Sequence, residues 1–160
     1  MIKTYPTSQP DIPEGYYIEV APDRLCAIED VLKNKNDYSI FLGQRLALVH
    51  NGVRILVSAI DAGYCKTWDE AIKMSCLPGF QQLPTRAQAL EIHRAVHHGF
   101  NRAVNELLFT HIFVGDYWTR DESDDPSIAK HFAYSADFAY GNISRRGKSE
   151  KASVRFIWEF

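Results

Sequence analysis

Long hydrophobic runs and an excess of charge of either sign are both missing from this 160-residue sequence. No stretch approaches the roughly 18 apolar residues that a membrane helix requires, and residues 1–6 lack the apolar core of a signal peptide. The 18 basic and 20 acidic residues nearly cancel, so no overall field would draw the chain to nucleic acid or anionic lipid. These absences predict a soluble, cytoplasmic protein without a membrane partner, and they argue against nucleic acid as a partner.

Cysteine is scarce as well, since only Cys26, Cys65 and Cys76 are present and none has the Cys-x-x-Cys spacing of a metal or redox motif. An odd, sparse set argues against a disulfide or zinc framework. We therefore interpret all three as buried or free thiols. A bridge between Cys65 and Cys76 stays open as an alternative for an oxidising compartment.

The hydrophobic content of 46% and the aromatic content of 12% suffice for one filled core but not for two. We therefore expect a single domain over residues 1–160. Three prolines among polar residues predict an extended lead-in over residues 1–16. Pro22 and Asp23, followed by apolar residues at helical spacing, predict a first helix over about 22–34.

The middle of the chain carries the strongest local signals. Apolar runs predict strands at 40–42, 46–49 and 53–60, with Asn51-Gly52 as a hairpin turn between the last two. Thr67 with Glu70 and Thr85 with Gln88 are capping boxes that predict a second helix, ending before Pro78-Gly79, and a longer third helix. Gly99 is expected to interrupt the third helix, whose apolar stripe is Ala89, Ile92, Val96, Phe100, Ala103 and Leu107.

The last third of the chain changes to a period of two. Aromatic residues alternate with smaller ones over 132–140 and again over 154–160, which predicts two strands with aromatic inner faces. A polar run over 141–151 is expected to join these strands as a loop. The three tryptophans fall inside predicted elements and are interpreted as core residues. Together these elements predict an α+β fold.

Five short motifs in a fixed order resemble the DUF1566 family of bacterial and phage proteins over residues 53–158. The resemblance implies a C-type-lectin-like fold, in which two main helices flank antiparallel strands and the chain ends come together. It implies no activity, because this fold carries many functions. Gln82, Thr119 and Arg120 depart from the family pattern. The motifs are Thr67-Trp68-Asp69-Glu70-Ala71, Leu83-Pro84-Thr85-Arg86, Tyr117-Trp118-Thr119, the aromatic strand before Gly141, and Val154-Arg155.

Two clusters could in principle hold a metal ion. His93 and His97 are four positions apart on the third helix, a spacing that can chelate one ion, although no glutamate follows the first histidine. The acidic run 121–125 carries oxygen ligands of the kind that calcium prefers, but it lacks EF-hand spacing. Helix-edge histidines and a solvated acidic loop are the simpler interpretations, so we expect no cofactor.

The leading hypothesis is a non-enzymatic binding module that recognises a protein partner through two loops, at 120–128 and 141–151, on a rigid scaffold. A phage or mobile-element origin would fit the resemblance, with the virion as a second location. The alternatives are a metal-dependent enzyme using His93 and His97, and a structural component of a virion or surface assembly. The sequence names neither the partner nor the oligomeric state. The candidate binding residues are Arg120, Asp121, Glu122, Asp124, Asp125, Asn142, Arg145, Arg146 and Lys148.

Overall fold

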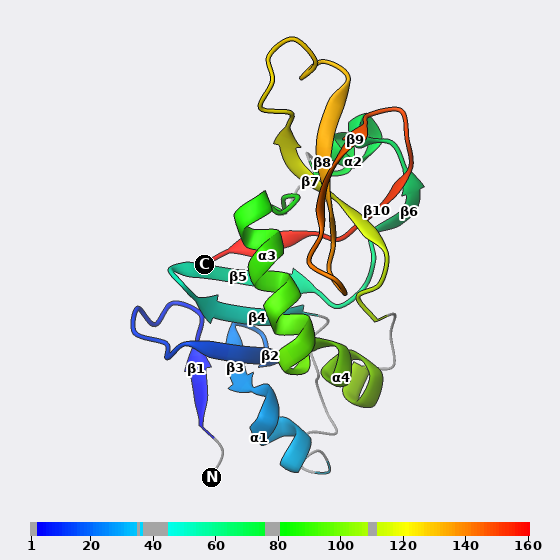
Figure 1. Ribbon diagram of the computed structural model, residues 1–160. Helices are drawn as coiled ribbons and strands as arrows, with labels where there is room; N and C mark the ends of the chain where they lie inside the picture. Colours follow the sequence, from blue (N-terminus) through cyan, green and yellow to red (C-terminus); the bar gives the residue numbers. More distant parts are fainter. Residues whose placement is uncertain (1–2, 35, 37–44, 76–80, 109–111) are drawn as a thin grey trace.

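Two mainly antiparallel sheets and several helices give the chain an α+β fold (Figure 1). The computed structural model describes residues 3–34, 36, 45–75, 81–108 and 112–160. The first sheet has the strand order β1 (Thr4–Pro6), β3 (Arg24–Ala27), β2 (Gly15–Ala21), β4 (Arg45–His50), β5 (Val53–Ser58) and β11 (Ile157–Glu159). The second has the order β6 (Gly63–Lys66), β10 (Ala152–Val154), β7 (Asp116–Glu122), β8 (Phe132–Asp137) and β9 (Ile143–Gly147), in which β10 and β7 are parallel.

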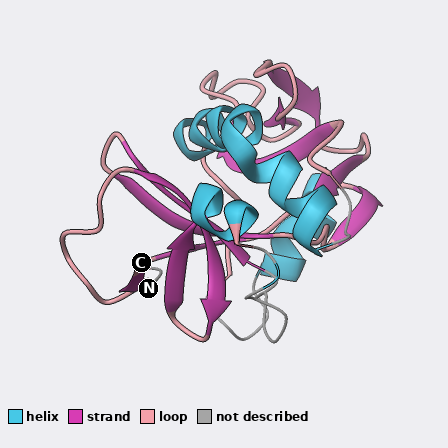
Figure 2. Ribbon diagram, turned by 90° about the horizontal axis from the view of Figure 1, so that it is seen from below, coloured by secondary structure: helices cyan, strands magenta, loops and turns pink. Residues whose placement is uncertain are grey.

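The longest helical segment lies across both sheets and fills the main core. Every member of its predicted apolar stripe is buried, and Gly99 interrupts the helix with a φ of 143°, as predicted. Figure 2 shows this segment and α1 (Ile28–Lys33) on the same side of the first sheet. The helical segment comprises α3 (Arg86–Ala95), η2 (Val96–Phe100), α4 (Asn101–Ala103) and η3 (Val104–Leu108). No helix in the described ranges is long and apolar enough to cross a membrane.

Both predicted capping boxes are present. Thr67 Oγ1 accepts from the Glu70 amide at 3.3 Å, and the Glu70 carboxylate accepts from the Thr67 amide at 3.1 Å, so α2 (Trp68–Ser75) begins where expected. Thr85 and Gln88 make the same reciprocal bonds at the start of α3. Each box satisfies two amides that the helix itself leaves unpaired. The predicted helix stop at Pro78-Gly79 and the predicted strand at 40–42 lie outside the described residues.

The Asn51-Gly52 hairpin is also confirmed. Asn51 and Gly52 have φ values of 50° and 77°, which are the positive angles that a tight two-residue hairpin turn requires. The prediction of a helix beginning at residue 22 was wrong, because Arg24–Ala27 is β3 and the helix begins at Ile28. Asp23 has a φ of 58° and turns the chain back, so β3 pairs with β2. Pro22-Asp23 is therefore a turn and not a helix start.

Two predictions for the last third were wrong. The polar run 141–151 is not all loop, because Ile143–Gly147 forms β9 and pairs with β8. The expected single strand over 154–160 is divided at Arg155 and Phe156 into β10 and β11, which belong to different sheets. The chain therefore crosses from the second sheet to the first within this segment.

The lead-in packs against the first sheet on the face opposite the helices. Ile12 is buried there in a cluster with Leu25 and Leu56 from the sheet. Arg54 of β5 donates to the carbonyl oxygens of residues 7, 9 and 10, at 2.7 to 3.2 Å. Residues 4–6 form β1 and pair with β3, so the lead-in contributes an edge strand to the sheet.

A buried ion pair joins the two sheets. The Nε atom of Arg155, which follows β10, lies 2.6 Å from Asp61 Oδ1, and both side chains are almost fully buried. The Tyr117 hydroxyl of β7 donates to the same carboxylate oxygen at 2.9 Å, and the Arg155 guanidinium lies 3.7 Å from the centre of the Phe113 ring. Charge is therefore balanced inside the core at the point where the two sheets meet.

Because of the Tyr117 phenol, we expect the stability of this junction to fall at alkaline pH. Burial raises the pKa of Tyr117, because it disfavours the phenolate, and the nearby Asp61 carboxylate raises this pKa further. The contribution of the neutral phenol is therefore complete at neutral pH and is lost above about pH 10, where the unfolded chain releases this proton. We expect urea denaturation to show a steeper loss of stability above that pH for the wild type than for Tyr117→Phe. Equal losses in the two proteins would contradict the assignment, and Tyr140→Phe, at an exposed site, is the control.

Candidate binding surface

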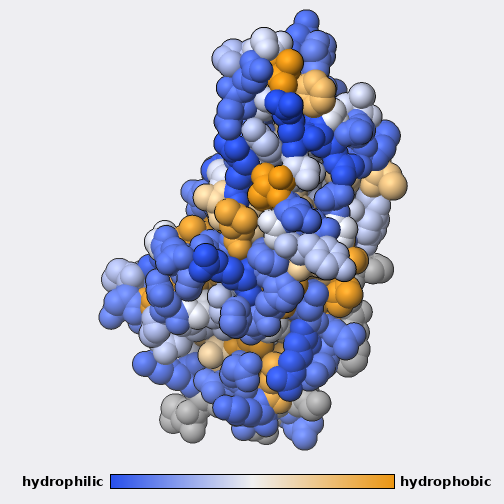
Figure 3. Space-filling model, in the orientation of Figure 1, coloured by the Kyte–Doolittle hydropathy of each residue, from blue (hydrophilic) through white to orange (hydrophobic). Residues whose placement is uncertain are grey.

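The second sheet extends past the first turn of α3 and carries a polar surface at its far end (upper part of Figure 1). This part of the molecule is largely hydrophilic in Figure 3. One face of the sheet packs against α2, and Trp68 of α2 and Trp118 of β7 are both buried in the core between them, as predicted. We call the opposite face at this end the distal face. It is formed by Arg86, Asp121, Asp124, Asp125, Tyr134 and Arg145.

The alternation along β8 sends its aromatic side chains to the distal face. Ala133 and Ser135 are buried, whereas Phe132 and Tyr134 are only half-buried. The prediction of an aromatic inner face was therefore wrong for this part of the strand. Residues directly opposite each other in an antiparallel pair lie on the same face of the sheet. Tyr134 therefore lies on the same face as Arg145, its partner in β9.

Arg86 organises the distal face from the first turn of α3. Its two terminal nitrogens each donate to one oxygen of Asp124 at 3.0 Å, and its guanidinium lies 4.1 Å from the centre of the Tyr134 ring. The Arg86 amide donates to Asp121 Oδ2 at 2.7 Å. The Tyr134 hydroxyl donates to Asp124 at 3.3 Å. The two hydrogen bonds to the Asp124 carboxylate and the contact with the Tyr134 ring fix the planar guanidinium in one orientation.

These contacts keep the carboxylates of the loop ionised. The hydrogen bonds from Arg86 lower the pKa of Asp124, and those from the Ser127 side chain and amide lower the pKa of Asp125. A lowered pKa means that each contact is intact above the ordinary aspartate value of about 3.9 and is lost only as the pH falls further. The distal face therefore keeps its charge pattern throughout the neutral range.

Arg145 is the cation of the distal face without a salt bridge to any described residue. Its side chain is exposed, and its guanidinium lies 5.6 Å from the centre of the Phe132 ring. Arg145 is close enough to Asp125 to contribute to the lowered pKa of that carboxyl group. An arginine supported by a ring and open to solvent is available to a partner.

Three other predicted residues lie on the α2 side of the sheet. Lys148 Nζ is 2.8 Å from Glu122 and 4.2 Å from the centre of the Trp68 ring. Arg146 is paired with Asp116 at 2.6 Å and donates to the carbonyl oxygen of residue 151. These side chains connect parts of the second sheet to one another and are separate from the distal face.

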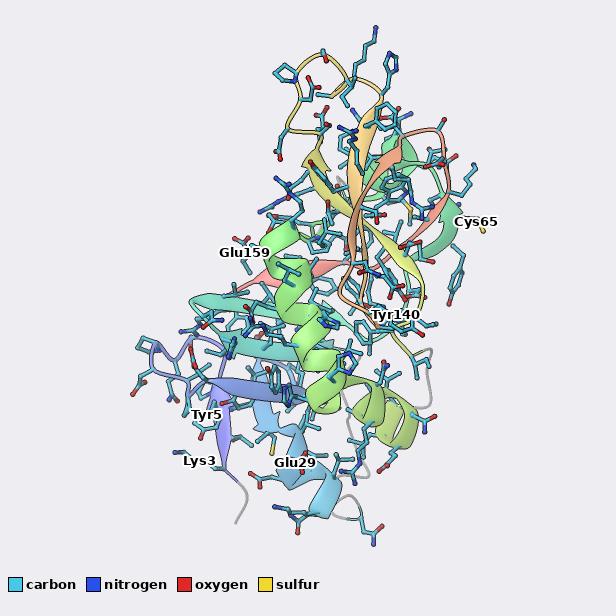
Figure 4. All side chains as sticks on the ribbon, in the orientation of Figure 1. Lys3, Tyr5, Glu29, Cys65, Tyr140 and Glu159 are labelled. Carbon is cyan, nitrogen blue, oxygen red and sulfur yellow. The ribbon has the colours of Figure 1, made fainter. Side chains whose placement is uncertain are left out.

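Arg120 and Asn142 are also separate from the distal face. Arg120 lies within β7, donates to Gln82 and lies 3.6 Å from Glu159. Asn142 lies in the turn at the opposite end of the β8–β9 hairpin from the loop 123–131, beside Tyr140, which Figure 4 labels. The two predicted binding loops are therefore partly strand, and the structure does not bring the nine candidate residues onto one surface.

Both histidines of the predicted pair hydrogen-bond to backbone carbonyl groups of that turn. His93 Nδ1 lies 2.8 Å from the Phe138 carbonyl oxygen, and His97 Nε2 lies 2.7 Å from the Ala139 carbonyl oxygen. Among the described residues, no three His, Cys, Asp or Glu side chains are grouped so that they could hold a metal ion. The carboxylates of 121–125 are also taken up by protein groups, since Asp121 and Asp124 bind Arg86, Glu122 binds Lys148 and Asp125 accepts from Ser127. Cys26 is buried and Cys65 is exposed, while Cys76 lies outside the described residues.

Sequence reasoning did not identify Arg86 as part of the site. Arg86 contacts residues more than thirty positions later in the chain, and only the fold brings them together. Its place directly after the Thr85 cap, in the Leu-Pro-Thr-Arg motif, was the available signal. No family model and no curated protein matches the chain.

Proposed function

We propose that this protein is a non-enzymatic binding module that recognises a protein partner through the distal face of a C-type-lectin-like scaffold. The observation that carries the proposal is the fixed Arg86 guanidinium, held between Asp124 and Tyr134 beside the exposed Arg145. Arginine and tyrosine are the residue types that most often dominate binding energy at protein interfaces. Because their side chains are already ordered, little conformational entropy is lost when a partner binds.

The scaffold assignment has its own support. Antiparallel strands are flanked by α2 and by the long segment that begins with α3, as the resemblance implies. One feature departs from the resemblance, because β1 and β11 lie at opposite edges of the first sheet with four strands between them, so the first and last strands do not come together. The five motifs that carry the resemblance include both capping boxes, Trp118 and the buried Arg155.

The test is an affinity capture from host lysate, followed by a binding measurement with the purified partner. We expect Arg145→Glu to weaken that binding by about tenfold or more, because it places a carboxylate where the partner meets a cation. Arg24→Glu is the matched control, since Arg24 is also exposed but lies in β3 of the first sheet. An equal loss with both variants, or no protein captured above background, would contradict the proposal.

A further inference from the structure

The strand β9 is an edge of the second sheet. Within the described parts of the chain, β9 pairs with β8 on one side and with no strand on the other. Edge strands present backbone donors and acceptors to solvent, and a further strand can pair with them. The pairing register determines which groups β9 presents.

The bonds at the two ends of the hairpin fix that register. The Asp137 amide donates to the Asn142 carbonyl oxygen at 2.9 Å, and the Lys148 amide donates to the His131 carbonyl oxygen at 2.8 Å. Along a strand of an antiparallel pair, residues alternate in the direction of their backbone groups. In one residue the amide and carbonyl bond to the partner strand, and in the next they point away from it. Ser144 therefore bonds to β8, as does Arg146, while Ile143, Arg145 and Gly147 direct their backbone groups outward.

Gly147 is closed by its own turn. Its amide donates to Glu150 Oε2 at 2.9 Å, and its carbonyl oxygen accepts from the Glu150 amide at 2.9 Å. Ile143 and Arg145 have no such partners in the described ranges, so each presents a free amide and a free carbonyl. These groups repeat at about 7 Å along the strand, which matches the backbone spacing of an added strand.

The charges on β9 indicate what could pair with this edge. The strand contains two arginines and no acid, and Arg145 is the one without a salt bridge among the described residues. A second copy of the chain would place Arg145 against another cation, which disfavours pairing. An acidic extended segment would place a carboxylate there instead.

From this arrangement we infer that β9 binds an extended acidic segment of the partner as an added strand. The inference rests on the proposed function and names the partner's chemistry. The added strand carries an acidic residue opposite Arg145 and an apolar residue two positions away, opposite the half-buried Ile143. Both side chains then lie on the same face of the sheet as Arg86 and Tyr134.

The first experiment uses a defined probe, the capped heptapeptide Thr-Val-Thr-Glu-Thr-Val-Thr, and a version with lysine in place of glutamate. Amide hydrogen exchange by NMR is measured on the intact protein. We expect the glutamate peptide to slow exchange at Ile143 and Arg145, and to bind about tenfold more tightly than the lysine peptide. Arg145→Glu should reverse that preference. Binding of the peptide without protection of these two amides would overturn the inference.

The second experiment removes one outward amide. Ile143→Pro deletes an amide that does not bond to β8, so the hairpin is retained, whereas docking of a strand is blocked. Ile143→Val is the matched control and should bind the glutamate peptide as the wild type does. Equal peptide binding by Ile143→Pro and Ile143→Val would overturn the inference.

The natural partner separates this inference from the proposed function. If Arg145→Glu loses the partner and Ile143→Pro keeps it, strand addition is wrong and the distal face still binds the partner. If lysate yields no partner but the peptide protects Ile143 and Arg145, the edge binds acidic strands and the proposed function fails. Loss of the partner with both variants supports both conclusions.

Discussion

Replacing Asp61 with asparagine is expected to lower the free energy of unfolding by about 3 to 5 kcal/mol. The change keeps the shape of the side chain but removes its charge, so the Arg155 guanidinium, 1% exposed, loses its balancing carboxylate. A buried charge left without its counter-ion costs far more than an exposed ion pair contributes. Urea denaturation followed by far-ultraviolet circular dichroism at pH 7 measures the effect.

The control for Asp61→Asn is an arginine–carboxylate pair that is exposed to solvent. Arg102 and Glu106 are 3.1 Å apart on the surface of the long helical segment, and Glu106→Gln should change stability by less than about 1 kcal/mol. A loss at Asp61 no larger than the loss at Glu106 would show that the junction between the sheets does not depend on this pair.

Replacing Trp118 with alanine is expected to cost about 3 to 5 kcal/mol of stability. Trp118 is fully buried in the core beside α2, where its removal leaves a large cavity. Its Nε1 also donates to the Lys66 carbonyl oxygen at 2.7 Å, so the substitution removes a hydrogen bond to β6 as well. Chemical denaturation measures the loss.

Tyr140→Ala is the comparison for Trp118→Ala. Tyr140 is another large aromatic residue, in the turn between β8 and β9, but its side chain is 80% exposed, so its removal should change stability by about 0.5 kcal/mol or less. Similar denaturation midpoints for the two variants would place Trp118 outside the core, contrary to the structure.

The elements that the sequence predicted correctly are those specified by neighbouring residues. A capping box acts over three positions, and Asn51-Gly52 turns the chain on its own, so these features can be identified before any tertiary contact is known. The apolar stripe of the long helical segment follows from helical geometry in the same way. Trp68 and Trp118 were placed in the core correctly, whereas Trp158 is only partly buried.

The elements that were mispredicted depend on partners far away in the sequence. β9 reads Ile-Ser-Arg-Arg-Gly, which has no apolar alternation, because an edge strand is stabilised by its ladder with β8 more than by burial. Arg24–Ala27 is too short to show a period, and its pairing with two strands overrides the helical spacing around it. In the binding surface, Asp121, Asp124, Asp125 and Arg145 were predicted, but Arg86, which organises them, acts only across the fold.

The crossing from β10 to β11 has a consequence for folding kinetics. Ala152 pairs with Lys66 in one sheet, and Ile157 pairs with Val57 in the other. These two pairings lie close together at the end of the chain, and each of them closes a long loop. Closing long loops is entropically costly, and folds rich in such distant pairings reach the native state slowly. Each sheet gains a strand from the same short stretch of chain. Neither sheet can therefore be completed before this stretch has docked.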